Sequence, residues 1–477
     1  MYIGLSNDTL ILIVQIIYIL TVLSIVIVVI SENRNPIKTV AWIMAVIFLP
    51  VIGIIWYLIF GQDVTKKHVI SKRIYSRLKK RPLNEIGAQE EFVFPEEYVS
   101  LITLLKNLDH SPLLGGNDVK LFTDGQDKFD SLFADIANAK KHIHVEYYAL
   151  MDDEIGKKFQ EALIKKAREG LEIRIIYDSF GSRKVKKEYY EEYRKAGIET
   201  EPFLKLAFPA LTSRINYRNH RKIVVIDGRI GYVGGMNVAD RYIHGFEWGC
   251  WRDTHARIEG KGVQGLQSAF LIDWYFVSQT LITSRKYFPA LGIYGNNPMQ
   301  IVDSGPLKEE NGIPFGILQA IYNAKRSIFI QTPYFLPPDA MIKALHAAAI
   351  RGVDVRIMLS ERSDMPLVQL ASRSYIQEML ENEVKMYFYN KGFLHSKLMV
   401  FDDSLTLVGS TNFDSRSLEQ NFEIEAFIYD EETGKQARSI FIADQHDCEQ
   451  IFLKNWIKRP RLERFLESCV RLFVPLL

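Results

Sequence analysis

One polar pattern occurs twice in this chain with identical internal spacing, and it constrains the fold more than any other feature. The first copy, from Asn219 to Asn237, reads NHRKIVVIDGRIGYVGGMN, and the second, from Leu394 to Asn412, reads LHSKLMVFDDSLTLVGSTN. In both copies Lys follows His by two residues, Asp follows His by seven, and the last Asn follows His by seventeen. This reuse, with 175 residues between His220 and His395, indicates two related halves.

The segments before each copy repeat as well. Helical spacing of apolar residues predicts helices over 127–140, 154–169, 316–324 and 339–350, and a further helix over 262–279 joining the halves. Runs of β-branched and aromatic residues predict strands over 143–148, 171–177, 327–331 and 353–359. Helices that alternate with strands predict an α/β fold, with two tandem α/β/α halves packed about a pseudo-twofold axis.

The length of 477 residues exceeds that of one ordinary domain. We expect a membrane anchor over 1–62, a basic juxtamembrane linker over 63–115, a first half over 116–280, and a second half with an amphipathic tail over 281–477. A net charge of +2 gives no sign of a nucleic-acid-binding surface. Three cysteines without paired spacing fit a reducing compartment.

The first sixty residues contain two apolar segments, 10–30 and 40–60, each of 21 residues without a charge. Each can cross the ~30 Å hydrocarbon core as a helix, so we expect two transmembrane helices. Because Pro50 lies inside the second segment, a re-entrant or tilted helix remains an alternative there. A basic cluster follows, which predicts a cytoplasmic side and contact with anionic headgroups. Its members are Lys66, Lys67, Lys72, Arg73, Arg77, Lys79, Lys80 and Arg81.

Each motif copy combines an imidazole with a cation. His220 and Lys222 are two residues apart, as are His395 and Lys397, so each pair shares one face of a strand. A lysine opposes a metal cation but suits a phosphate, and we expect neither a metal nor another cofactor. If both pairs converge on one phosphate, one imidazole can attack phosphorus while the other protonates the leaving oxygen.

The remaining residues of the repeated pattern divide into two groups. The Gly-Gly-x-Asn turn of Asn237 and the Gly-Ser-x-Asn turn of Ser410 and Asn412 bring backbone N–H groups and amides toward phosphate oxygens. Asp227 and Asp402 complete the pattern on the opposite strand face from His and Lys. We expect these two carboxylates to close turns or pair with backbone rather than to react.

These residues resemble the H-x-K-x4-D signature of the phospholipase D superfamily in its two-copy form, over the chain from about residue 119 to the end. In that family an acidic residue beyond the motif orients the catalytic His. The resemblance assigns this role to Glu423 in the second half and to Asp253, in WRDTH, in the first. Within the superfamily the chain is most similar to bacterial cardiolipin synthases, in NYRNHRK, WRDTH, QTPYF, the terminal PLL and the apolar amino-terminal segments.

The resemblance implies a phosphatidyltransferase of the bacterial inner membrane, multi-pass, with a cytoplasmic catalytic domain. Such enzymes join two phosphatidylglycerol molecules and release glycerol through a phosphatidyl-histidine, formed here on His220 with His395 as acid and base. The expected partners are phosphatidylglycerol and anionic membrane lipids, and no nucleic acid. The near-symmetric copies leave the order of the two histidines open.

Other interpretations remain open at the level of sequence. The same chemistry with water or another alcohol as acceptor gives a phospholipase D or a transphosphatidylase. A nucleic-acid phosphodiesterase has no use for membrane spans, and a non-enzymatic scaffold would not keep both motifs intact. The tail over 451–477, which mixes apolar and basic residues, either lies on the bilayer or packs against the domain.

Overall fold

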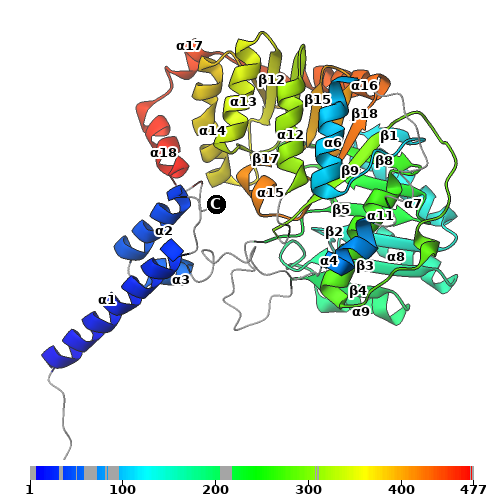
Figure 1. Ribbon diagram of the computed structural model, residues 1–477, viewed down its shortest axis with the longest axis horizontal. Coiled ribbons are helices and arrows are strands. Elements are labelled where there is room, and N and C mark those ends of the chain that lie inside the picture. The colour runs from blue at the N-terminus through cyan, green and yellow to red at the C-terminus, as the bar shows by residue number, and fades with distance from the viewer. Residues whose placement is uncertain are drawn as a thin grey trace, which may run out of the picture.

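The computed structural model describes residues 7–31, 36–49, 51–57, 72–80, 83, 96–204, 217–306, 308, 311–472 and 474. Two sheet-centred halves form one body, and the amino-terminal helix α1 extends away from it (Figure 1). Each half is a mixed sheet with helices against it. The α/β class expected from the alternating pattern is therefore confirmed.

The first half contains a seven-stranded sheet in the order β1-β8-β6-β5-β2-β3-β4. Its strands are β1 (Asp118–Phe122), β2 (His142–Tyr147), β3 (Glu172–Asp178), β4 (Glu199–Phe203), β5 (Lys222–Ile226), β6 (Ile230–Gly234) and β8 (His255–Glu259). Its helices are α7 (Gly125–Asn138), α8 (Glu154–Arg168), α9 (Lys187–Lys195), the short α10 (Arg241–His244) and α11 (Val263–Ser278).

The second half contains an eight-stranded sheet in the order β19-β13-β12-β10-β15-β16-β18-β9. Its strands are β9 (Met299–Ser304), β10 (Ser327–Gln331), β12 (Asp354–Ser360), β13 (Lys385–Tyr389), β15 (Leu398–Phe401), β16 (Leu405–Gly409), β18 (Glu423–Tyr429) and β19 (Cys448–Ile451). Its helices are α12 (Gly312–Asn323), α13 (Asp339–Ile350), α14 (Pro366–Glu381), α15 (Ser415–Glu419), α16 (Glu431–Gln445), α17 (Leu453–Trp456) and α18 (Arg461–Arg471). Apart from the extra edge strand β19, equivalent strands follow the same order in both sheets.

The two motif strands, β5 and β15, lie where the halves meet. Ile223 and Val225 of β5 and Leu398 and Val400 of β15 belong to one buried apolar cluster. On the outer faces, α7, α8 and α9 cover the first sheet, and α12, α13 and α14 cover the second. The packed inner faces fix the two motif copies relative to each other.

The elements agree with the sequence expectations to within a few residues. The strand β10 and the helix α13 have the expected bounds. The helix α12 begins at Gly312, earlier than expected. Pro314 is compatible with this start, since in the first turn its missing N–H costs no hydrogen bond.

The segment expected as a linker contributes to the cores. The helix α6 (Val99–Asp109) buries Leu101 and Leu105 against the second half, because these side chains recur at helical spacing. Lys79, in the short helix η2 (Ser76–Lys80), is only 1% exposed. It forms ion pairs with Asp109, at 2.7 Å, and with Asp303. Lys79 is thus neutralised inside the protein, and the expectation that it contacts lipid headgroups is wrong.

The amino-terminal segment differs from the expected pair of spans. The helix α1 (Asn7–Ser31) contains a stretch of 21 residues, Ile11–Ser31, with mean hydropathy 3.0. The second apolar segment forms two shorter helices, α2 (Pro36–Phe48) and α3 (Ile52–Trp56), with Val51 at φ +66° between them. Thirteen residues of α2 rise about 20 Å, less than the hydrocarbon core. Among the described residues, one helix is long enough to cross a membrane, and a second transmembrane helix is not confirmed.

Candidate active site

The two motif copies meet through backbone that crosses between the halves. The strand β7 (Cys250–Arg252) pairs in parallel with β14 (Gly392–Leu394), and Asn219 forms the equivalent bridge to Phe422. His220 N–H donates to the Phe422 carbonyl at 2.9 Å, and His395 N–H donates to the Arg252 carbonyl at 2.7 Å. Each histidine is therefore held at its backbone by the opposite half.

The acidic partners cross in the same way. His220 Nδ1 lies 3.0 and 3.1 Å from the two carboxylate oxygens of Glu423, in the second half. His395 Nδ1 lies 2.6 Å from Asp253 Oδ2, in the first half. When the Nδ1–H of each ring donates a hydrogen bond to its carboxylate, the lone pair of the neutral imidazole is on Nε2 and is available for reaction. The sequence identified the two acids but carried no signal of this crossed pairing.

Burial keeps both imidazoles neutral. The pKa of His395 is lowered to about 3 by burial and by the nearby Lys397, which Asp253 opposes. Burial also lowers the pKa of His220, while the Glu423 carboxylate opposes that change. Both rings can thus offer a lone pair, and an anion bound beside either ring would raise the pKa of that ring.

Each motif lysine lies against the histidine of its own copy, and the charges of both lysines act on both imidazoles. Nζ of Lys222 donates to the His220 carbonyl, and Nζ of Lys397 donates to the His395 carbonyl, each at 2.5 Å. Both side chains are buried, and burial lowers the pKa of Lys222 to about 7 and that of Lys397 to about 8. A nearby phosphate would restore the positive charge of both, so this pair of lysines is suited to binding an anion.

The residues of the Gly-x-x-Asn turns take different places in the two halves. Asn237 accepts from the Ala149 N–H at 3.0 Å and donates to the Tyr242 hydroxyl at 2.5 Å, so both ends of its amide are occupied within the protein. The Oδ1 atom of Asn412 is buried and has no hydrogen-bond partner among the described residues. The Ser410 hydroxyl donates to Glu423, and its carbonyl lies 3.1 Å from His220 Nδ1. Ser410 thus positions the crossed acid.

Asp227 and Asp402 hold turns together. Asp227 accepts from the N–H groups of residues 140, 141 and 142 at 2.7–3.0 Å. Asp402 accepts from those of residues 325, 326 and 327 at 2.7–2.8 Å. Both have positive φ, 55° and 52°, which Asp tolerates better than most residues. The expectation that these carboxylates pair with backbone is confirmed.

Sequence reasoning missed one residue behind the site. Arg221 is fully buried and forms ion pairs with Asp273 and, at 3.1 Å, with Asp303. Its Nε donates to the Glu423 carbonyl at 3.1 Å, so it fixes the acid that faces His220. The second copy has Ser396 at the equivalent position. Because Arg221 is not repeated in the second copy, a comparison of the two copies does not identify it.

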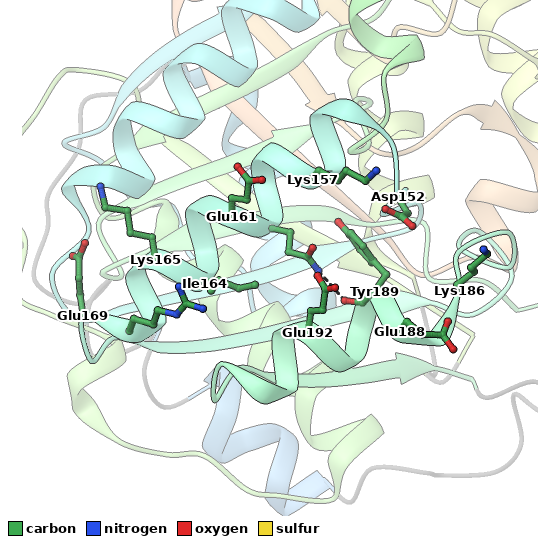
Figure 2. A pocket seen from close by; sticks show the side chains of 12 residues that line it. Asp152, Lys157, Glu161, Ile164, Lys165, Glu169, Lys186, Glu188, Tyr189 and Glu192 are labelled. Atoms are coloured by element: carbon green, nitrogen blue, oxygen red, sulfur yellow. Dashed lines mark hydrogen bonds between the residues drawn. The ribbon is translucent and has the colours of Figure 1, made fainter.

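A surface groove lies away from these residues. Figure 2 shows it between α8 and α9, lined by side chains of mixed charge such as Lys157, Glu161 and Glu192. None of the motif residues lines it. Alternating charges on an exposed face are typical of a solvated helix surface, and we assign no role to this groove.

The comparisons with known proteins agree with the crossed double motif. The model of the cardiolipin synthase, phospholipase D-like domain matches residues 132–251 and 317–445, and the phospholipase D-nuclease N-terminal model matches residues 16–62. The chain is 41% identical over 472 residues to the major cardiolipin synthase ClsA of Bacillus subtilis, covering 96% of this chain and 98% of that protein.

The chain belongs to the bacterial cardiolipin synthases of the phospholipase D superfamily. A cardiolipin synthase of Listeria monocytogenes is 38% identical over 457 residues, covering 94% of this chain and 95% of that protein. A phosphatidylserine synthase of Haemophilus influenzae has a similar fold, with a TM-score of 0.62 and 14% sequence identity. That likeness covers 78% of this chain and 97% of the other.

Proposed function

We propose that this cardiolipin synthase joins two phosphatidylglycerol molecules into cardiolipin and glycerol through a covalent phosphatidyl-histidine. The observation that carries the proposal is the crossed site, in which two buried imidazoles each face a carboxylate of the other half and share two lysines. This arrangement provides one nucleophile, one acid and base, and a cationic cradle for a single phosphate.

In the first step, His220 Nε2 attacks phosphorus and the P–O bond to the glycerol headgroup breaks. His395, protonated, gives its proton to the departing oxygen, so that glycerol leaves neutral. In the second step, neutral His395 takes the proton of a hydroxyl of the second phosphatidylglycerol. That oxygen attacks phosphorus, the P–N bond to His220 breaks, and both histidines return to their starting states.

The roles of the two histidines rest on family resemblance, and their surroundings support it. Asp253 lies 2.6 Å from His395 Nδ1, and such a short contact favours an imidazolium, the form that an acid requires. Lys397, 2.9 Å from the same atom, opposes this charge in the free enzyme. A bound phosphate pairs with Lys397 and offsets its charge. His395 can therefore carry a proton in the complex with substrate but not in the free enzyme.

The protein is a membrane enzyme in this proposal. The apolar α1 helix anchors it, and α2 and α3 supply the rest of a multi-pass or re-entrant segment. Arg77 and the other cations beyond α3 favour a cytoplasmic catalytic domain at the inner membrane of the bacterium. A reporter fused after Leu477 is then active on the cytoplasmic side, and activity on the outer side reverses this orientation.

The tail helix α18 supports contact with the bilayer, because it buries an acidic side chain and exposes apolar ones. Glu467 is 3% exposed and pairs with Arg373 and Arg459 beneath the helix, whereas Leu462 and Phe465 are 69% and 63% exposed. An apolar face turned to solvent beside arginines suits an anionic interface. A spin label at Phe465→Cys then gains oxygen accessibility in phosphatidylglycerol vesicles, unlike a label at Arg168→Cys, and equal accessibility at both sites contradicts the contact.

The test of the proposed function is mass spectrometry of lipids after incubation of the purified protein with phosphatidylglycerol. We expect cardiolipin and glycerol in equal amounts, and neither from the His220→Ala, His395→Ala double variant. Phosphatidic acid in place of cardiolipin indicates a phospholipase D that uses water. Lipids of another alcohol, formed only when that alcohol is added, indicate a transphosphatidylase.

A further inference from the structure

A second cationic group lies beside His220 and outside the motif lysines. Arg218 and His220 flank Asn219, which bridges in parallel to Phe422, so both side chains emerge on the same side of this bridge. Its carbonyl accepts from the Phe422 N–H at 2.9 Å, which places Arg218 at the crossing between the halves. Tyr148 lies between this arginine and the site, because its ring is 5.3 Å from the His220 ring. Burial raises the pKa of the Tyr148 hydroxyl, and the nearby Arg218 charge opposes that rise.

Among the described residues, part of the Arg218 guanidinium has no hydrogen-bond partner. The residue is 4% exposed, and its Nε and Nη1 atoms have no hydrogen-bond partner among the residues that the structure describes. The carboxylate of Asp178 is nearby, but it accepts from the N–H groups of Phe180, Gly181 and Asn219 at 2.8–3.1 Å. Unsatisfied donors of a buried cation are costly, and an anionic ligand removes that cost.

An exposed arginine continues the cationic group toward solvent. Arg183 and Arg218 both stack on the Phe180 ring, with guanidinium carbons 4.2 and 4.6 Å from its centroid. Phe180 is 36% exposed, so the stack leads from the buried Arg218 to the surface. An aromatic ring that holds two guanidinium groups fixes their planes, which favours recognition of a phosphate.

The second half has no equivalent of this stack at the matching position. The residue two before His395 is Phe393, fully buried and packed edge-on against Trp251 at 4.9 Å. The motif copies are therefore symmetric in their histidines and lysines but asymmetric in charge beside them. The asymmetry matches the reaction, in which one lipid gives up its headgroup and the other keeps its phosphate unreacted.

We propose that Arg218, with Arg183 and Phe180, binds the phosphate of the acceptor phosphatidylglycerol while the terminal hydroxyl of that lipid attacks the phosphatidyl-histidine. This inference rests on the proposed function. The acceptor phosphate is three carbons from the reacting hydroxyl, so it must lie close to the phosphate that Lys222 and Lys397 hold. Both motif lysines hold the transferred phosphate, so a further cation must neutralise this one. Arg218 is a buried cation two residues before His220, with donors that no described residue uses.

The test separates acceptors with and without a phosphate in the full-length protein. Arg218→Gln is assayed for cardiolipin formation, which needs two phosphatidylglycerol molecules, and for exchange of labelled glycerol into phosphatidylglycerol, which needs one. We expect cardiolipin formation to fall about ten- to a hundredfold, mainly through a raised KM, while glycerol exchange stays near wild type. Arg218→Lys recovers part of the loss.

Matched variants keep the test decisive if Arg218→Gln fails to fold. Arg183→Gln, at an exposed position, lowers cardiolipin formation less but spares exchange in the same way, and Arg168→Gln on α8 changes neither reaction. Equal losses of both reactions overturn the proposal, because Arg218 then serves the transferred phosphate or the fold. No loss in either reaction in both arginine variants also overturns it. Failure of the proposed function itself is distinct, because wild-type protein then forms no cardiolipin.

Discussion

His220 faces both carboxylate oxygens of Glu423, at 3.0 and 3.1 Å, whereas His395 faces one oxygen of Asp253 at 2.6 Å and the ammonium of Lys397 at 2.9 Å. The side chain of His220 is also slightly more exposed, at 13% against 9%. The duplicated sequence supplies the same functional groups twice. Their surroundings, which were not duplicated faithfully, are what can assign them different roles.

The same contrast extends to the turns. Asn237 uses its amide to hold Ala149 and Tyr242, while the Oδ1 atom of Asn412 is left without a partner among the described residues. The amide of Asn237 is therefore used within its own half, whereas the Asn412 oxygen has no partner among the described residues. A repeated motif does not imply repeated function at each of its positions.

The largest expected effect is the loss of either histidine. His220→Ala and His395→Ala each reduce cardiolipin formation at least about a thousandfold, and the double variant is little worse, because the pair acts as one unit. Steady-state assays of the three variants check this. Losses that multiply in the double variant contradict a single site that needs both rings.

Replacing the crossed acids separates the two roles. Asp253→Asn and Glu423→Gln each lower kcat by about a hundredfold or more, because the neutral amide no longer supports an imidazolium or fixes the tautomer. A donor with a better leaving group restores the Asp253→Asn variant but not Glu423→Gln, since only protonation of the leaving oxygen is relieved. Equal restoration of both variants argues against distinct roles.

The motif lysines make substrate capture depend on pH. Burial lowers the pKa of Lys222 to about 7 and that of Lys397 to about 8, so both lose their protons as the pH rises through this range. We expect kcat/KM to fall above about pH 7, and more steeply above about pH 8, while kcat changes less because bound phosphate raises both pKa values. A pH profile with kcat/KM constant to pH 10 is the contrary result.

The smallest effect on chemistry is expected at the two aspartates. Asp227→Asn and Asp402→Asn each lower the free energy of unfolding by about 1–3 kcal/mol, because an amide turns donors toward backbone N–H groups. Asp402 is the more buried of the two, so its variant loses more. Thermal unfolding measures both, and kcat of the folded fraction stays near wild type. A large fall in kcat without loss of stability contradicts the structural role.

Much of this architecture follows from local sequence. The apolar runs of β5 and β15 and the helical spacing in α8 and α13 determine the elements, and the motif spacing identified both His–Lys pairs. The crossed partners do not follow, because His220 and Glu423 are 203 residues apart and only packing of the halves brings them together. The ion pairs of Lys79 were missed for the same reason.

The amino-terminal segment shows a different limit. Its second apolar run has the length and composition of a span, yet Val51 adopts a left-handed backbone that separates α2 from α3. Hydropathy averages over such a break, and only Pro50 in the sequence pointed to it.

The most direct test of the account is to trap the intermediate in the His395→Asn variant. The enzyme is loaded with a donor lipid that is labelled in its phosphatidyl group and has a better leaving group than glycerol. Peptide mass spectrometry then locates the label. We predict phosphatidyl on His220, released slowly because no base activates the acceptor, and no label in His220→Asn. Label on His395 in the His220→Asn variant, with none on His220 in the other, contradicts the assignment of the two roles.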